Sequence, residues 1–244
     1  WRLLQGDLGI SIFSNLPVTQ LIAQRLEPTL ALTISTLLVA VVLAVPMGVL
    51  AAWKARSLAD RLVMGFAVMG FAVPVFLAGY ILIYLFSIKL GWLPVQGYRP
   101  IAQGLWPFVE GLILPSVALG TTYCALIARI TRASMLEVLS QDYIRTAESK
   151  GLATRRVLLL HALKNSAVPI VTVIGIGIAL LISGVVITET VFNIPGLGRL
   201  TVDAVLKRDY PIVQGLILVF AAGKVLVNLM IDISYAFLDP RIRY

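Results

Sequence analysis

Residues 142–164 read DYIRTAESKGLATRRVLLLHALK, and long apolar segments lie on both sides of this charged stretch. Hydrophobic residues make up 59% of the 244 positions and charged residues only 13%, whereas a soluble domain carries about 25% charged residues. Too few charged residues remain to cover a water-facing surface, so lipid must cover much of the chain. The sequence therefore predicts a membrane protein in which residues 142–164 form a helical loop at the membrane surface.

Five apolar segments are long enough to cross a bilayer, which requires about 20 residues. Each should be a helix, because a backbone polar group in lipid must find its partner within its own segment. The predicted fold class is an all-α membrane protein, with an external segment at 1–26 and a transmembrane domain at 27–244. The predicted spans lie near 29–53, 62–88, 111–135, 166–190 and 211–238.

The basic residues predict the orientation of these spans. If the 54–61 loop, residues 129–164 and the C-terminus share one side, that side holds twelve Lys and Arg, and the opposite side holds seven. The richer side is expected to be cytoplasmic. Residues 136–165 then form a cytoplasmic loop, and residues 191–210 form an external one. This bias accounts for the net charge of +8 without nucleic acid, for which a basic patch with interleaved aromatics is missing.

Catalytic and metal-binding patterns are absent from the sequence. The chain has one cysteine and one histidine, and it has no metal-ligand spacing. It also lacks the G-x-x-x-x-G-K-[ST] loop that cradles nucleotide phosphates. We therefore expect no enzyme activity, no metal and no cofactor in this chain.

The charged loop contains signals for two helices. Ser140 is a predicted N-cap, and an acid at Asp142 complements the dipole of the first helix. Lys150 followed by Gly151 matches a helix stop, which predicts a helix over 141–150. Thr154 is predicted to cap a second helix over 155–164. Acids and bases mixed on the first helix favour a protein groove, whereas a solvated topology loop is the alternative.

Several motifs in a fixed order now indicate a family. Residues 142–151 and 161–165 resemble the Asp-Tyr-x-Arg-Thr-Ala-x-x-Lys-Gly and His-Ala-Leu-x-Asn patterns of ABC importer permeases of the dipeptide, oligopeptide, nickel and glutathione type. The general Glu-Ala-Ala pattern of such loops is met only at Ala147, and its later proline is replaced by Lys164. Further motifs cover nearly the whole chain: GDLG at 6–9, RASM at 132–135, ETVF at 189–192, PGLG at 195–198, RDYP at 208–211 and DPRIR at 239–243.

This resemblance implies a type I ABC importer transmembrane domain in a bacterial inner membrane, with a further span before Trp1 and a cytoplasmic C-terminus. It implies a second permease subunit, two cytoplasmic ATPase subunits that hold ATP and Mg, and an external binding protein that delivers peptides or a similar small solute. The implied ATPase-coupling residues are Asp142, Tyr143, Arg145, Thr146, Ala147, Glu148, Lys150 and Gly151. The alternatives are an ion-coupled secondary transporter or channel, and a membrane scaffold without transport.

Two further groups of residues are functional candidates. The external loop could dock the binding protein or gate the cavity, or it could be a plain cap, and Glu189 could be a paired structural charge or a cavity-facing group. Lys224 and Asn228 lie four residues apart within the last span, where lysine is costly, so contact with a partner subunit is expected first and with substrate second. The external candidates are Glu189, Pro195, Gly196, Gly198, Arg199 and Asp209.

Overall fold

The computed structural model describes residues 6–238, with the side chains of 183, 184 and 238 excepted. The terminal motif at 239–243 and the C-terminal end lie outside the described residues. Contacts divide the chain into two compact units, which are described separately. Unit 1 comprises Trp1–Thr36, Pro74–Leu119 and Ile178–Leu226, and unit 2 comprises Leu37–Val73, Gly120–Gly177 and Val227–Tyr244.

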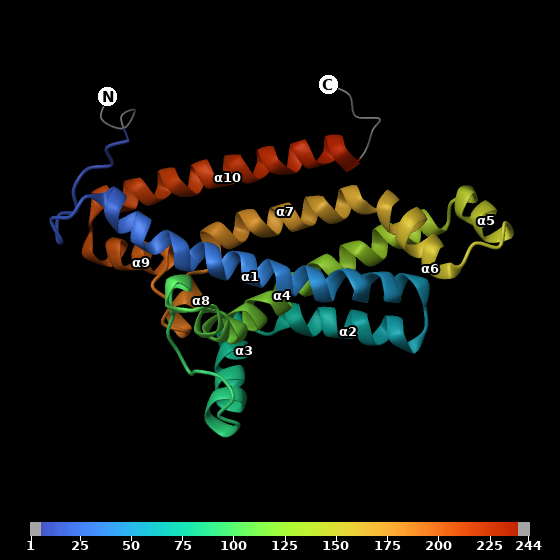
Figure 1. The fold of residues 1–244 in the computed structure, drawn as a ribbon, viewed down its shortest axis with the longest axis horizontal. Helices are drawn as coiled ribbons and strands as arrows, with labels where there is room; N and C mark the ends of the chain where they lie inside the picture. Colours follow the sequence, from blue (N-terminus) through green and yellow to red (C-terminus); the bar gives the residue numbers. More distant parts are fainter. Residues whose placement is uncertain (1–5, 239–244) are drawn as a thin grey trace. The chain divides into compact units, whose positions relative to one another are not determined.

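The described residues form helices joined by turns and loops (Figure 1). Among the described residues, three helices, α1, α4 and α10, are long and apolar enough to cross a membrane, and the number rises to as many as five if each of two bent helix pairs counts as one span. The elements are α1 (Val18–Trp53), α2 (Leu58–Ala72), α3 (Val75–Leu82), η2 (Ile83–Lys89), η3 (Ile101–Gln103), α4 (Leu105–Leu139), α5 (Asp142–Ser149), α6 (Thr154–Arg156), η4 (Val157–Leu163), α7 (Ala167–Gly184), α8 (Val186–Val191), α9 (Leu197–Lys207) and α10 (Tyr210–Leu238).

The segment predicted as one span at 62–88 is interrupted at Pro74. Val73 is extended, with φ −83° and ψ 122°, and it ends α2. Proline disfavours helical geometry in the residue before it, so the break follows from the sequence. Helix α3 then begins at Val75 and continues as the π-helix η2.

Unit 1 is held together by α1, α9 and α10, and by the packing of α3 on α8 (Figure 1). Gly215 lets α10 approach α1, because a Cβ there would lie 2.8 Å from Val18 Cγ1. Tyr98 anchors the segment before α4 by donating a hydrogen bond to Glu27 Oε1 (2.9 Å). Burial and this bond raise the pKa of Tyr98. One apolar cluster of this unit contains Val18, Ile22, Leu197, Leu200, Ala204, Ile212 and Leu216.

Two apolar clusters of described residues lie in unit 2. In the first, α1, α4 and α7 meet through Ala40, Ala44, Cys124, Ile127, Ala128 and Val173. Gly48 belongs to the same crossing, since a Cβ there would lie 2.8 Å from the Ala128 carbonyl oxygen, and small residues allow such close helix approach in membranes. The second cluster lies beneath α5 and is described with the site.

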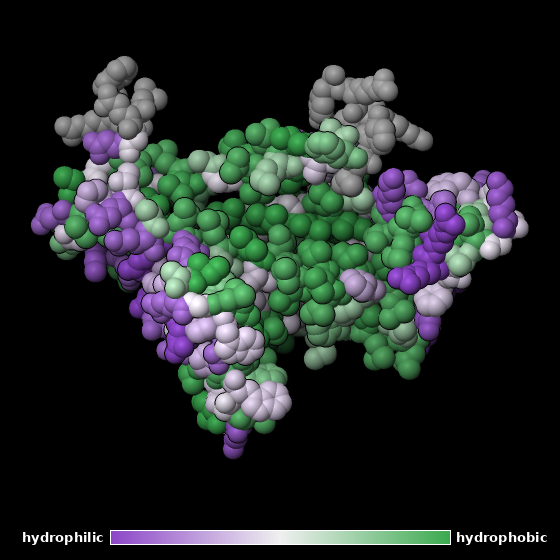
Figure 2. All heavy atoms as spheres, viewed as in Figure 1, coloured by the Kyte–Doolittle hydropathy of each residue, from purple (hydrophilic) through white to green (hydrophobic). Residues whose placement is uncertain are grey.

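The surface agrees with a membrane setting. Large apolar side chains remain exposed on α1, α2 and α10, among them Leu38 (61%), Leu62 (65%) and Val225 (68%). Figure 2 shows hydrophobic residues over much of the visible surface and hydrophilic ones gathered over α5 and α6. Exposed apolar area of this extent requires lipid or another protein to cover it.

Candidate functional site

Helix α5 begins at Asp142 and ends at Ser149. Ser140 is not its N-cap, which corrects the sequence prediction: Gln141 takes that place, and the Ser140 hydroxyl donates back to the Glu137 carbonyl at 2.7 Å. The stop at Gly151 is confirmed by its left-handed φ of +76°, and its N–H donates to the Glu148 carbonyl at 2.9 Å. The first helix of the charged loop is therefore short and closed at its C-terminal end.

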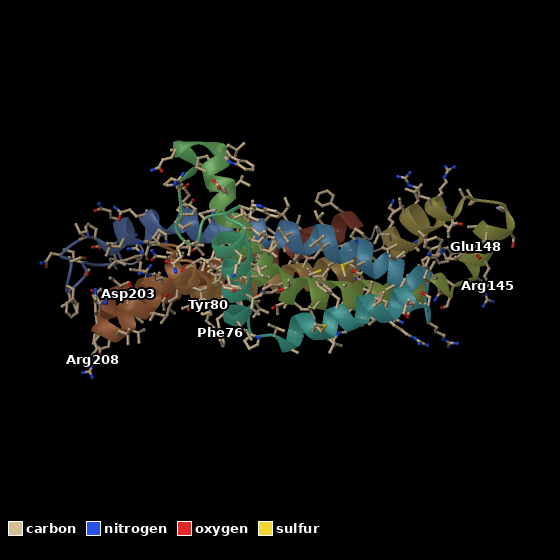
Figure 3. The ribbon with its side chains drawn as sticks, turned by 90° about the horizontal axis from the view of Figure 1, so that it is seen from below. Phe76, Tyr80, Arg145, Glu148, Asp203 and Arg208 are labelled. Carbon is tan, nitrogen blue, oxygen red and sulfur yellow. The ribbon has the colours of Figure 1, made fainter. Side chains whose placement is uncertain are left out.

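One face of α5 is buried and the other is exposed. Ile144 (1% exposed) and Ala147 (7%) pack into a cluster with Ala52, Met135, Val157, Leu158 and Ala162. The other seven residues predicted to couple to an ATPase are exposed, and Figure 3 shows Arg145 and Glu148 projecting outward from the helix. Arg145 lies 3.6 Å from Asp142, but an exposed pair of this kind contributes little to stability. The charges of α5 are thus available to a partner.

The second helix of the loop packs against the buried face of α5. It begins at Thr154 with Ala153 as N-cap, so the prediction that Thr154 is the cap is wrong by one residue. It continues as η4, whose Val157 and Leu158 are buried in the α5 cluster. His161 lies in η4, where its carbonyl accepts from Asn165 Nδ2 at 2.6 Å.

Glu189 is fully buried in unit 1 and hydrogen-bonded on both carboxylate oxygens. Its Oε1 accepts from Thr29 Oγ1 (2.7 Å), and its Oε2 accepts from the Arg199 N–H (2.8 Å). Thr29 Oγ1 in turn accepts from the Leu197 N–H (2.8 Å). A carboxylate that binds the free N–H groups at the start of α9 both satisfies them and complements the helix dipole. Glu189 therefore ties α8 to α1 and α9.

The glycines of the PGLG turn make room for this carboxylate. A Cβ on Gly196 would fall on the Glu189 carboxylate, and one on Gly198 would lie 2.9 Å from Val186 Cγ2. Pro195 and Arg199 are half-buried, and the Arg199 side chain donates to Asn193 Oδ1. The turn is thus built around a buried carboxyl group.

Replacing Thr29 with valine is expected to destabilise unit 1 by about 1–3 kcal/mol, because it leaves Glu189 Oε1 and the Leu197 N–H without their partner. The measurement is the thermal unfolding midpoint of the protein in detergent. Thr36→Val is the matched control on the same helix, since Thr36 Oγ1 is buried with no hydrogen-bond partner among the described residues. An equal loss in both variants would contradict this account of Thr29.

Asp209 is also buried, and it anchors the segment that precedes α1. Its Oδ2 accepts from Ser11 Oγ (2.6 Å), and its Oδ1 accepts from the Ile12 N–H (3.4 Å). The charges that α9 and its C-cap present outward are Asp203, Lys207 and Arg208, of which Figure 3 labels the first and last. Sequence reasoning thus placed Asp209 among the surface candidates, whereas the exposed charge belongs to its neighbours.

The intramembrane pair on α10 is exposed. Lys224 belongs to unit 1 and Asn228 to unit 2, and both side chains are open to their surroundings. Within the described part of the chain, no group of three or more His, Cys, Asp and Glu side chains could hold a metal ion.

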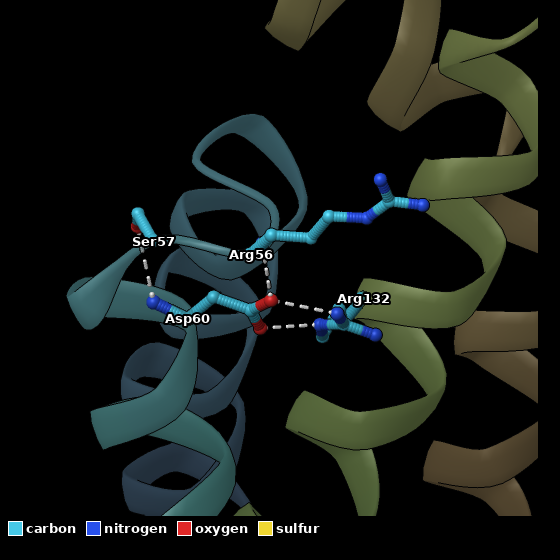
Figure 4. A network of polar contacts seen from close by, with 4 residues as sticks. All are labelled: Arg56, Ser57, Asp60 and Arg132. Carbon is cyan, nitrogen blue, oxygen red and sulfur yellow. Dashed lines mark hydrogen bonds and ion pairs between the residues drawn. The ribbon is translucent and has the colours of Figure 1, made fainter.

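Sequence reasoning missed an ion pair in unit 2, shown in Figure 4. Arg132 on α4 donates from Nε to Asp60 Oδ1 (2.5 Å) and from Nη2 to Oδ2 (2.7 Å). Asp60 is 4% exposed and also accepts from the Arg56 N–H (2.9 Å). Ser57 Oγ accepts from the Asp60 N–H (3.5 Å). This Ser-x-x-Asp capping pattern was the available signal, although it does not reveal Arg132.

Comparisons with known proteins agree on one family. The family model described as binding-protein-dependent transport system inner membrane component matches residues 44–244. A probable peptide ABC transporter permease, y4tP of Sinorhizobium fredii, is 54% identical over 99% of this chain and 77% of its own length. The Escherichia coli K12 dipeptide permease DppB is 41% identical over 100% and 79%, and the glutathione permease GsiC of the same strain is 46% identical over 99% and 76%.

Solved structures show the same fold. The inward-facing MetNI methionine ABC transporter superposes with a TM-score of 0.74 at 14% identity, covering 91% of this chain and 97% of that chain. An amino acid ABC transporter gives 0.60 at 16% identity, covering 92% and 95%.

Proposed function

The chain belongs to the family of binding-protein-dependent transport system inner membrane components and is a permease subunit of an ABC importer, and from this premise we propose that it forms half of a translocation pathway for peptides. It is an inner membrane protein with the fold of type I importer membrane domains. The proposed assembly contains a second permease subunit, two cytoplasmic ATPase subunits and an external binding protein.

The observation that carries this proposal is the two-faced construction of α5. Its apolar face is fixed in the cluster around Ile144 and Ala147, while its charged face is open. A short helix that is packed rigidly on one face can transmit the movement of a partner that binds its other face. We propose that an ATPase subunit binds the exposed face and that α5 passes the closure of the ATPase dimer to the spans. ATP biases the permease only through its different affinity for the two states.

The nucleotide chemistry is proposed to lie on the partner. ATP and Mg would be held by the ATPase subunits, and this chain would contribute no catalytic group. With α5 on the ATPase side, the C-terminus is cytoplasmic and the 191–210 loop is external, as the excess of basic residues predicts. The exposed charges of α9 and its C-cap, Asp203, Lys207 and Arg208, then face the binding protein, and Glu189 and Asp209 hold the loop in place.

The substrate class is supported by the relatives, whose names give peptide, dipeptide and glutathione transport. These solutes are short chains of amino acids joined by amide bonds, with charged amino and carboxylate groups. We therefore propose import of short peptides or peptide-like solutes, selected mainly by the external binding protein.

Uptake into proteoliposomes tests this function. We expect a labelled dipeptide or glutathione to accumulate only when the permease pair, the ATPase subunits, the binding protein and internal ATP are all present. Uptake by the permease without an ATPase would favour the ion-coupled alternative and contradict the proposal. Assembly with an ATPase but no ATP-dependent uptake of any short peptide would contradict the substrate class.

A further inference from the structure

The ion pair between Asp60 and Arg132 fixes the turn that joins α1 to α2. The Asp60 carboxylate receives three donors, two from the Arg132 guanidinium and one from the Arg56 N–H. Arg56 has a left-handed φ of +65°, which costs free energy in a residue with a side chain. A carboxylate that holds a neighbour in this conformation determines the shape of the turn, which would not persist by local preference alone.

Helix α4, which carries Arg132, also contributes to the apolar cluster beneath α5. Met135 lies three residues further along α4, is fully buried, and belongs to the cluster that contains Ile144 and Ala147 of α5. Ala52, in the last turn of α1, belongs to the same cluster. One turn of α4 therefore contacts α5 through Met135 and the start of α2 through Arg132.

We propose that Asp60 and Arg132 form a clamp that makes the α1–α2 turn move together with α5 when an ATPase drives α5. This proposal rests on the coupling function of α5 given above. The two residues are positioning residues that touch neither nucleotide nor substrate. A buried ion pair stabilises a fold little more than apolar residues of the same volume would, whereas its two parallel hydrogen bonds define one geometry. A contact that transmits movement from one helix to another requires such a single, defined geometry.

The experiment compares ATP hydrolysis with uptake in the complete reconstituted transporter. The variant is Asp60→Asn with Arg132→Gln, which removes both charges and so avoids an unpaired buried charge. We expect ATPase subunits to remain bound and hydrolysis to stay near the wild-type rate. Uptake should fall so that the ATP hydrolysed per peptide imported rises about tenfold, the scale of a typical coupling free energy.

Two further variants sharpen the comparison. Arg132→Lys keeps the charge but not the bidentate contact, so its ratio of ATP to peptide should lie between those of the wild type and the double variant. Arg129→Gln removes an exposed charge one turn earlier on α4 and should leave the ratio unchanged.

The outcomes separate this clamp from a folding role and from the proposed function. If hydrolysis and uptake fall in proportion, the pair serves only assembly and the clamp is overturned. A wild-type ratio in the double variant would overturn it as well. Failure of the coupling function itself would be visible in the wild type, as uptake that does not depend on the ATPase.

Discussion

Replacing Gly196 with alanine is expected to prevent the permease from reaching a stable folded state. The added Cβ falls on the Glu189 carboxylate, which is fully buried and cannot move without losing Thr29 and the N–H groups at the start of α9. Leaving these buried polar groups without their hydrogen-bond partners costs about 1–3 kcal/mol for each group, and losing several together removes a large part of the stability of a typical domain. The measurement is the yield and thermal unfolding midpoint of the purified permease.

Gly65→Ala is the matched control for this substitution. Gly65 lies within α2, and a Cβ there meets nothing within 4 Å. Alanine is favoured over glycine in a helix by about 1 kcal/mol, so this variant should be at least as stable as the wild type. A folded Gly196→Ala permease with an unchanged unfolding midpoint would contradict the close packing of the turn on Glu189.

Reversing the two central charges of α5, with Arg145→Glu and Glu148→Arg, should release the ATPase from the permease. Like charges brought together at an interface cost several kcal/mol, so the ATPase recovered with the tagged permease should fall by more than about tenfold. Both side chains are exposed, and the cluster beneath α5 is untouched. The permease itself should therefore keep its unfolding midpoint.

An equivalent reversal on α9, Asp203→Arg with Lys207→Glu, controls for the change in charge pattern. Both residues are exposed and lie on the side predicted to be external. This variant should retain the ATPase, although delivery by the binding protein could weaken. Normal ATPase recovery by the α5 variant, or its loss in the α9 variant, would argue against α5 as the ATPase contact.

Local features were the predictable ones. The fold class followed from apolar segment length, since lipid leaves a helix as the only way to pair the backbone. The end of α5 was predicted from Gly151, because glycine readily adopts the left-handed conformation that is common just after a helix. The N-cap of α5 was placed one residue too early, because the Ser140 hydroxyl donates to the Glu137 carbonyl of the preceding helix and does not accept from the first turn of α5. Competition of this kind depends on geometry that the sequence does not display.

Pairings between distant residues were not predictable. Glu189 finds Thr29 across 160 positions, and Asp60 finds Arg132 across 72. The sequence around each carboxylate is compatible with a structural, a gating or a topological role. Only the hydrogen-bond partner, which the folded structure shows, distinguishes these roles. Asp209 shows the consequence, because its position in an external loop indicated a surface charge, whereas Ser11 holds it in the interior of unit 1. Burial of a charge becomes visible only once the elements are packed.

The central claim is that the exposed face of α5 binds an ATPase subunit, and site-directed cross-linking tests it most directly. Cys124 is the chain's only cysteine and is buried, so Cys124→Ala gives a background for single cysteines at exposed positions. We predict that Thr146→Cys on α5 cross-links to the ATPase in native membranes, and that Leu206→Cys on α9 does not. Equal cross-linking at both positions, or none at Thr146, would contradict the claim.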